Sequence, residues 1–170
     1  MSDTRTGTIG LWPMIAITMM RVVVGWHFLY EGIAKLSSPA WTAAGYMRQA
    51  RGPFAEHFKW LASQPNLLAN ADLVTMWGLT LVGLCLVLGL LTRLASLAGI
   101  AFILLFYFAN PPFVGYFYSL PTEGSYLIVN KNLVELCALV VILVTGSGRF
   151  AGLDRILHVL LGRRPRLAAA

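Results

Sequence analysis

Four ionisable residues, Arg21, His27, Glu31 and Lys35, lie within one otherwise apolar stretch of the chain. At about 100° per residue of helix, their side chains share an arc roughly 120° wide on one face. A charged group near the centre of a bilayer costs about 2.5 to 3.5 kcal/mol, and such groups almost always face a bundle interior or a wet cavity. The stripe therefore predicts a polar helix face directed into the protein.

A second polar group opens the last apolar stretch of the chain and consists of Asn130, Lys131, Asn132 and Glu135. The first apolar stretch ends, and this one begins, at the same expected membrane face. Glu31, Lys35, Lys131 and Glu135 should therefore lie at similar depth, with His27 one turn deeper and Arg21 deeper still. Opposite charges can then meet: Glu31 with Lys131 or Lys35, and Glu135 with Lys131.

Two interpretations of this cluster stay open. In the first, two carboxylates in a poorly hydrated pocket, one turn from a histidine, form a site that exchanges protons. Glu31, Glu135 and His27 are then the candidate catalytic residues. In the second, the charges are satisfied ion pairs that only fix helix packing, with the lysines extending toward the membrane surface.

Several other chemistries find no support in the sequence. A metal or haem site is not expected, because His57 falls in a loop and His158 in the tail, so neither pairs easily with His27 across a bundle. The chain has no nucleotide-binding loop, no nucleophile with an obvious base and no spaced metal-ligand motif. Its Lys and Arg residues are scattered without a basic, aromatic-interleaved stripe, so no nucleic-acid partner is expected. Redox chemistry would need a diffusible cofactor or a partner protein.

The elements that must position these residues are membrane helices. The 170 residues are 58% hydrophobic and 12% charged, with a mean hydropathy of +0.71, which is too apolar for a soluble domain. Backbone groups in lipid have no water to bind, so spanning segments must be helices here. We expect a single all-α membrane domain over 1–170, a four-transmembrane-helix bundle formed by 11–36, 67–91, 94–109 and 130–145.

The connecting segments should lie along the membrane surface. The 37–66 loop carries aromatic residues at near-helical spacing and a Gly52-Pro53 break, which predicts short interfacial helices. The 110–129 loop adds Phe113, Tyr116, Phe117 and Tyr118, and the two loops together could roof the bundle. Residues 149–162 have the pattern of an amphipathic surface helix. The basic residues near the spans favour cytoplasmic termini and two outer loops.

Three short motifs resemble the DoxX family of membrane proteins. They are the run RVVVGWHFLYEGIAKL at 21–36, the turn LLTR at 90–93, and the ending NKNL at 130–133 followed by GR at 148–149 and GLDR at 152–155. The likeness extends over about 18–157. Within that family the chain looks most like the DoxD type, the membrane subunit of thiosulfate:quinone oxidoreductase, although we expect no fused soluble domain and find no evident sulfur-handling site in the sequence.

The resemblance implies a function in electron transfer. The polar pocket would be a quinone site in the bacterial inner membrane, where Glu31, Glu135 or His27 handles the protons that accompany quinone reduction. Its cofactor-binding residues would be Lys131, Asn132, Arg21 and Lys35. The implied partners are the lipid bilayer and a soluble or membrane redox subunit, with a homo-oligomer left open. The alternative is a non-catalytic membrane module that scaffolds partner proteins or passes a small solute.

Overall fold

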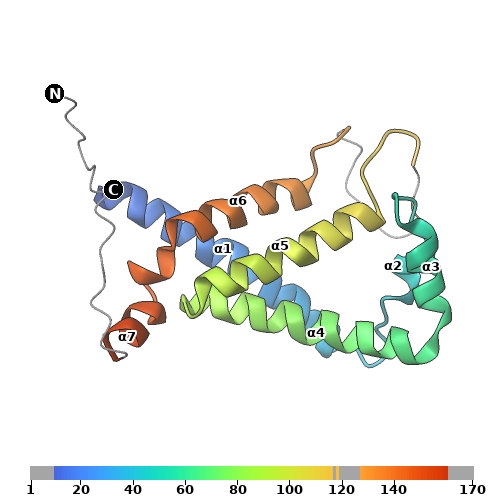
Figure 1. Ribbon diagram of the computed structural model, residues 1–170, viewed down its shortest axis with the longest axis horizontal. Helices are drawn as coiled ribbons and strands as arrows, with labels where there is room; N and C mark the ends of the chain where they lie inside the picture. The colour runs from blue at the N-terminus through green and yellow to red at the C-terminus, as the bar shows by residue number, and fades with distance from the viewer. Residues whose placement is uncertain (1–9, 117, 119–126, 161–170) are drawn as a thin grey trace.

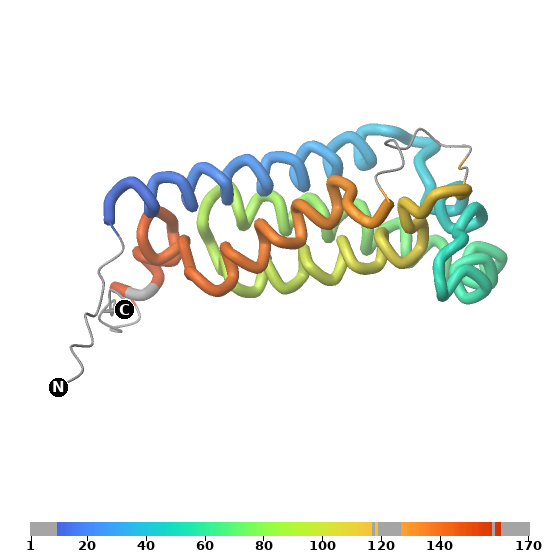
Figure 2. Tube along the Cα trace, turned by 90° about the horizontal axis from the view of Figure 1, so that it is seen from above, coloured from blue at the N-terminus to red at the C-terminus, as the bar shows by residue number. Residues whose placement is uncertain are grey.

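The computed structural model describes residues 10–116, 118 and 127–160, and every regular element within these ranges is helical. Four long helices run side by side along the molecule (Figures 1 and 2). They are α1 (Leu11–Leu36), α4 (Pro65–Leu88), α5 (Thr92–Ala109) and α6 (Lys131–Thr145). The expectation of an all-α chain is confirmed for the described residues.

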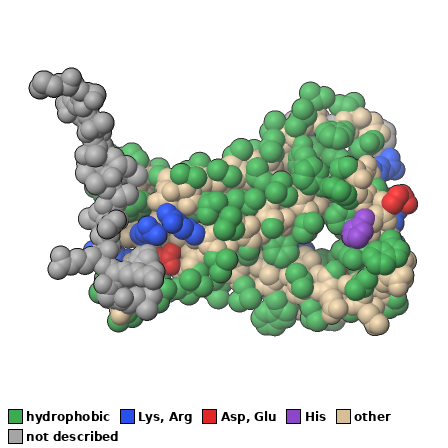
Figure 3. All heavy atoms as spheres, in the orientation of Figure 1, with side chains coloured by type: hydrophobic (Ala, Val, Ile, Leu, Met, Phe, Trp, Pro, Cys, Tyr) green, Lys and Arg blue, Asp and Glu red, His purple; other side chains and the backbone are tan. Residues whose placement is uncertain are grey.

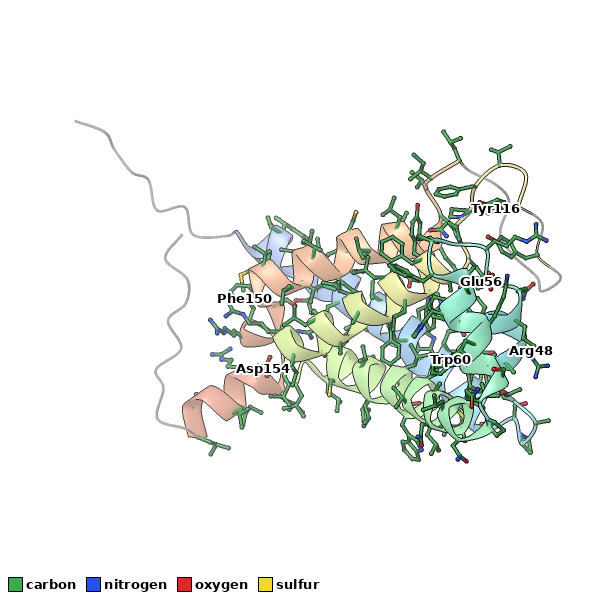
Figure 4. The ribbon with its side chains drawn as sticks, turned by 45° about the vertical axis from the view of Figure 1, so that its right-hand side comes forward. Arg48, Glu56, Trp60, Tyr116, Phe150 and Asp154 are labelled. Carbon is green, nitrogen blue, oxygen red and sulfur yellow. The ribbon has the colours of Figure 1, made fainter. Side chains whose placement is uncertain are left out.

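The short helices gather at the two ends of the bundle. α2 (Ala44–Arg48) and α3 (Ala55–Ser63) lie across one end, and we call the segment 43–63 that contains them the roof (Figure 1). η1 (Ser147–Arg149) and α7 (Leu153–Leu160) lie at the other end, the tail end. Figure 4 shows this separation, with Arg48, Glu56 and Trp60 at the roof end, and Phe150 and Asp154 at the tail end.

The helix bounds follow local sequence signals closely. α1 has the bounds that the sequence predicts, and α5 and α6 begin within two residues of the predicted positions. α4 starts at Pro65. Proline lacks a backbone N–H, but no hydrogen bond is lost at this position because the first N–H groups of a helix have no acceptor within it. It ends at Leu88, three residues before the predicted end, because Gly89 takes a left-handed conformation with a φ of 67° that stops the helix. Phe117 of the expected outer loop, and the part of the expected surface helix beyond residue 160, lie outside the described residues.

Three of the described helices, α1, α4 and α5, are long and apolar enough to cross a membrane. Their outer faces expose large apolar side chains, including Trp26, Trp77 and Leu94. Figure 3 shows hydrophobic side chains along most of the visible length of the bundle. A surface of this kind needs lipid rather than water around it, so the chain is a membrane protein.

Small residues bring α1 and α4 into close contact. A Cβ atom on Gly83 would lie 2.2 Å from the Leu29 nitrogen, and one on Gly32 would lie 2.3 Å from Thr80 Oγ1. Such contacts let two membrane helices pack backbone against backbone. In the tail half of the bundle, Leu86, Leu139 and Ile142 are fully buried between the four helices.

The tail end is held by the carboxylate of Asp154. It accepts hydrogen bonds from the Leu91 and Thr92 backbone nitrogens at 2.6 and 3.0 Å, and from Thr92 Oγ1 at 2.6 Å. It therefore caps the start of α5 from a distant part of the chain. Arg21, which is 2% exposed, donates to the Ala151 carbonyl oxygen at 2.7 Å beside this cap.

Candidate functional site

A cavity of about 1280 Å³ lies at the roof end, between the four long helices and the roof. Figure 3 shows the surface hollowed at this end, between α4, α5 and α3. Polar side chains from α1 and α6 form one wall, whereas aromatic and aliphatic side chains from α4, α5 and the roof form most of the rest. A volume of this size fits a drug-sized molecule, which typically occupies a pocket of about 300 to 1,000 Å³.

His27 is the centre of the polar wall. Its Nδ1 pairs with Oε1 of Glu135 on α6, and its Nε2 lies 3.9 Å from Oε1 of Glu31, one turn along α1. The other oxygen of Glu31 pairs with Nζ of Lys35, which also donates to the Glu31 backbone carbonyl at 3.2 Å. The imidazole therefore stands between two carboxylates, one on each side.

The α6 side of this wall adds Lys131 and Asn132, which both line the cavity. The charge of Lys131 acts on both His27 and Glu31. Two lysines thus stand against two glutamates in their ionised forms. The charge of this set is balanced when His27 is neutral, so gaining or losing a proton on His27 changes the net charge of the wall.

Local sequence explains how α6 presents these groups. The Asn130 side chain accepts a hydrogen bond from the Leu133 nitrogen at 3.1 Å and so caps the helix. This cap starts α6 at Lys131, which puts Glu135 one turn into the helix. Glu135 is only 15% exposed, so its carboxylate depends on its protein partners more than on water.

The roof is fastened to the end of α5 by hydrogen bonds. The Arg51 and Gly52 backbone nitrogens donate to the Ala109 carbonyl oxygen at 3.0 and 3.1 Å. A Cβ atom on Gly52 would lie 1.6 Å from the Phe108 carbonyl oxygen, so only glycine allows this approach. The Ala109 carbonyl, which lies in the last turn of α5 where a helix lacks internal donors, is therefore satisfied by the roof.

Two tyrosine hydroxyls complete the roof side of the cavity. Tyr46 donates to the Phe106 carbonyl oxygen at 2.8 Å, and Tyr118 donates to the Pro111 carbonyl oxygen at 2.7 Å. Burial raises the pKa of Tyr46, and burial together with the neighbouring Tyr46 raises the pKa of Tyr118 to about 12. Both phenols therefore stay protonated near neutral pH.

The structure brings together six of the seven residues that the sequence singled out. His27, Glu31, Lys35, Lys131, Asn132 and Glu135 all line the cavity. Arg21 lies at the tail end instead, buried against Ala151 and close to Gly89. The expected pair of Glu31 with Lys35 is present. Glu135 pairs with His27, a contact that the sequence did not predict.

Other lining residues were not identified from the sequence as part of a site. Phe102 and Phe106 form an apolar wall on α5, and Thr75 lies opposite on α4. The four-residue spacing of the two phenylalanines places them on one helix face, which is a detectable signal. Nothing in the sequence links Asn110 to α2, yet its Nδ2 donates to the Tyr46 carbonyl oxygen at 3.2 Å.

Comparisons with known proteins give one match. The sequence model of the DoxX family matches residues 16–110, which include most of α1, the roof, α4 and α5. Neither the curated proteins nor the solved structures contain a match to this chain.

Proposed function

The chain belongs to the DoxX family, and from this premise we propose that it is the membrane subunit of a quinone-linked oxidoreductase. The observation that carries the proposal is the cavity under the roof, which combines the His27–Glu135 pair with an apolar, aromatic opposite wall. A quinone has a flat apolar ring with a carbonyl oxygen at each end. A site that binds it needs both kinds of wall.

The residues present fit such a ring. Lys35, Lys131 and Asn132 carry donors that can bind carbonyl oxygens, and Phe102 and Phe106 offer apolar surfaces of the right size. A bound quinone would supply a two-electron acceptor that takes up two protons as it is reduced. The chain itself must therefore deliver protons inside a site with limited access to water.

The polar wall is arranged to deliver them. Glu135 holds His27 through Nδ1, which fixes the orientation of the ring and leaves Nε2 as the exchanging nitrogen. Glu31 lies within 3.9 Å of that nitrogen and can return a proton to it. Lys35 pairs with Glu31. This pairing offsets the electrostatic cost of placing a second carboxylate in a site with little water.

The same proposal includes the topology and the electron donor. α6 has 15 residues and spans roughly 22 Å, so we propose that flanking residues complete a fourth membrane crossing. The roof then lies on the outer face of the bacterial inner membrane, and both termini are cytoplasmic. The DoxD-like motifs favour a sulfur compound such as thiosulfate as the donor, acting through a separate redox subunit.

Quinone binding is the first test. Purified protein in lipid nanodiscs is expected to bind a short-chain ubiquinone analogue, measured by calorimetry or by quenching of tryptophan fluorescence. Glu135→Gln should weaken binding about tenfold or more, because His27 loses its partner. Glu56→Gln is the matched control, because Glu56 is exposed on α3 and pairs with Lys59. Absence of binding, or equal loss in both variants, would contradict the proposal.

The electron donor needs a separate test. Membranes that contain the protein should reduce added quinone with thiosulfate faster than membranes that lack it. Equal rates with retained quinone binding would reject thiosulfate as donor and leave the quinone site in place. Passage of a small solute through the bundle is disfavoured, since Leu86, Leu139 and Ile142 fill the tail half. A stable partner complex without substrate-dependent electron transfer would favour the scaffold alternative.

A further inference from the structure

We propose that the ligand of the cavity enters from the lipid through a gap between α4 and α5, and that it is an amphipathic molecule with a long apolar tail. The inference rests on the proposed function for the identity of the head group, a quinone ring. It goes further in naming the entrance and in requiring a tail that remains among α4, α5 and lipid.

On the polar side of the cavity, α1 contacts both of its neighbours. α1 and α4 meet at Gly25, Gly32 and Gly83, where no space remains even for a Cβ atom. α1 and α6 are joined across the wall by the pair of His27 and Glu135. These contacts hold α1 against α4 and α6 on the polar side of the cavity.

The roof is a fixed cover rather than an obvious entrance. Its connection to α5 is made by backbone donors at Arg51 and Gly52, by the Tyr46 hydroxyl and by the Asn110 amide. A further bond ties it to α4, because the Ala43 nitrogen donates to Asp72 Oδ1 at 2.8 Å. Lifting the roof would break all of these bonds at once.

The side between α4 and α5 is different. These helices leave a tight turn at the tail end and diverge toward the roof (Figure 1). They are in close contact at Gly78 and Phe102, where a Cβ atom on the glycine would lie 2.4 Å from Phe102 Cζ. Beyond this point, toward the roof, Figure 3 shows an opening in the surface between α4, α5 and α3.

Two residues mark the rim of this opening, because they line the cavity and are also strongly exposed on the outside. They are Val74 on α4, which is 62% exposed, and Leu105 on α5, which is 54% exposed. Both are aliphatic and lie on helices apolar enough to cross the membrane. A water-soluble ligand gains nothing from such a rim, whereas an apolar tail is stabilised there as in lipid.

A larger side chain at the rim should narrow the opening between α4 and α5, which tests the proposal. Leu105→Trp should slow the loading of long-tailed ubiquinone-10 from liposomes about tenfold, and should change the binding of tail-less ubiquinone-0 less than twofold. The matched control is Leu104→Trp, since Leu104 is exposed on the same helix and does not line the cavity. It should leave both quinones unaffected. Equal effects of the two variants, or equal loss of both quinones in Leu105→Trp, would overturn the proposal.

A second probe separates this inference from the proposed function. Vesicles containing a phospholipid with a photoreactive acyl chain should label Thr75 or Phe102, which line the cavity behind the rim, and Leu105→Trp should reduce that labelling. Labelling in a protein that binds no quinone would support the lateral entrance while the quinone assignment fails. Labelling confined to residues outside the cavity would overturn the entrance.

Discussion

Two charged side chains with little exposure, Glu135 and Arg21, have different neighbours. Glu135 lines the cavity and pairs with the imidazole of His27, which can gain or lose a proton. A ligand in the cavity would therefore lie beside a group that can exchange a proton. Arg21 is 2% exposed and lies against the Ala151 carbonyl and the Asp154 cap, far from that cavity. Its surroundings are those of a group that joins helices.

Replacing Arg21 tests this distinction. Arg21→Met should lower the free energy of unfolding by about 3 kcal/mol, because the Ala151 carbonyl and Asp154 lose a buried cationic partner. Urea denaturation in detergent micelles measures the change. Quinone binding by the folded fraction should stay the same as in the unmodified protein. A loss of affinity as large as that of Glu135→Gln would return Arg21 to the ligand site.

The raised pKa of Tyr118 predicts a stability change at high pH. Its folded value of about 12 lies above the ordinary 10.0, so the folded protein keeps this proton longer than the unfolded chain does. Stability from this group is therefore constant below pH 10 and is lost as the pH rises toward 12. Titration of tyrosinate absorbance should lose its component near pH 12 in Tyr118→Phe. An unchanged titration curve would contradict the assignment.

Sequence patterns predicted the local part of the site better than its packing. Glu31 and Lys35 are four residues apart on one helix, so their pair follows from helix geometry alone. The contact of His27 with Glu135 depends on how α1 and α6 are rotated about their axes. That rotation is set by packing over the whole bundle, which periodicity does not determine.

At the scale of elements, the roof shapes the cavity because it is bound to the ends of other helices. The Ala109 carbonyl accepts from both Arg51 and Gly52, and Asp72 accepts from Ala43. These hydrogen bonds to residues of α4 and α5 hold the roof in one position. The predicted break at Gly52-Pro53 lies at the point where the roof touches α5, where the glycine is required for close approach.

Two glycines in the roof provide a matched test. Gly52→Ala should lower Tm by about 2 to 12 °C, the shift expected for about 1 to 3 kcal/mol of overpacking, because the new methyl group meets the Phe108 carbonyl. Gly45→Ala should leave Tm unchanged or raise it, since nothing lies within 4 Å of a Cβ there and alanine favours the helix. Equal Tm values for the two variants would show that the roof does not depend on this contact.

Element positions were largely predictable, because long apolar segments in lipid have little choice but to form helices. The difference at the end of α4 arises from Gly89, Leu90 and Leu91, whose apolar character continues the pattern while Gly89 ends the helix. The cap of α5 by Asp154 was not predictable, because it joins residues more than 60 positions apart. Contacts over such separations depend on the finished fold.

At the scale of the whole molecule, the bundle has two halves with different properties. The tail half is packed with fully buried aliphatic side chains and held by Asp154, whereas the roof half encloses about 1280 Å³ of space. The polar stripe of α1 extends across both halves, which is why only part of it reaches the cavity. A stable half that supports a hollow half suits a membrane protein that binds a small molecule.

The most direct test of the quinone site is labelling with a photoreactive benzoquinone that carries an apolar tail, followed by mass spectrometry of the labelled peptides. We predict labels on α1 near His27 and Glu31 and on α6 near Glu135, and their loss when excess unlabelled quinone is added. Labels distributed over the lipid-facing surface, at residues such as Trp12 and Leu94, with no competition by unlabelled quinone, would contradict it.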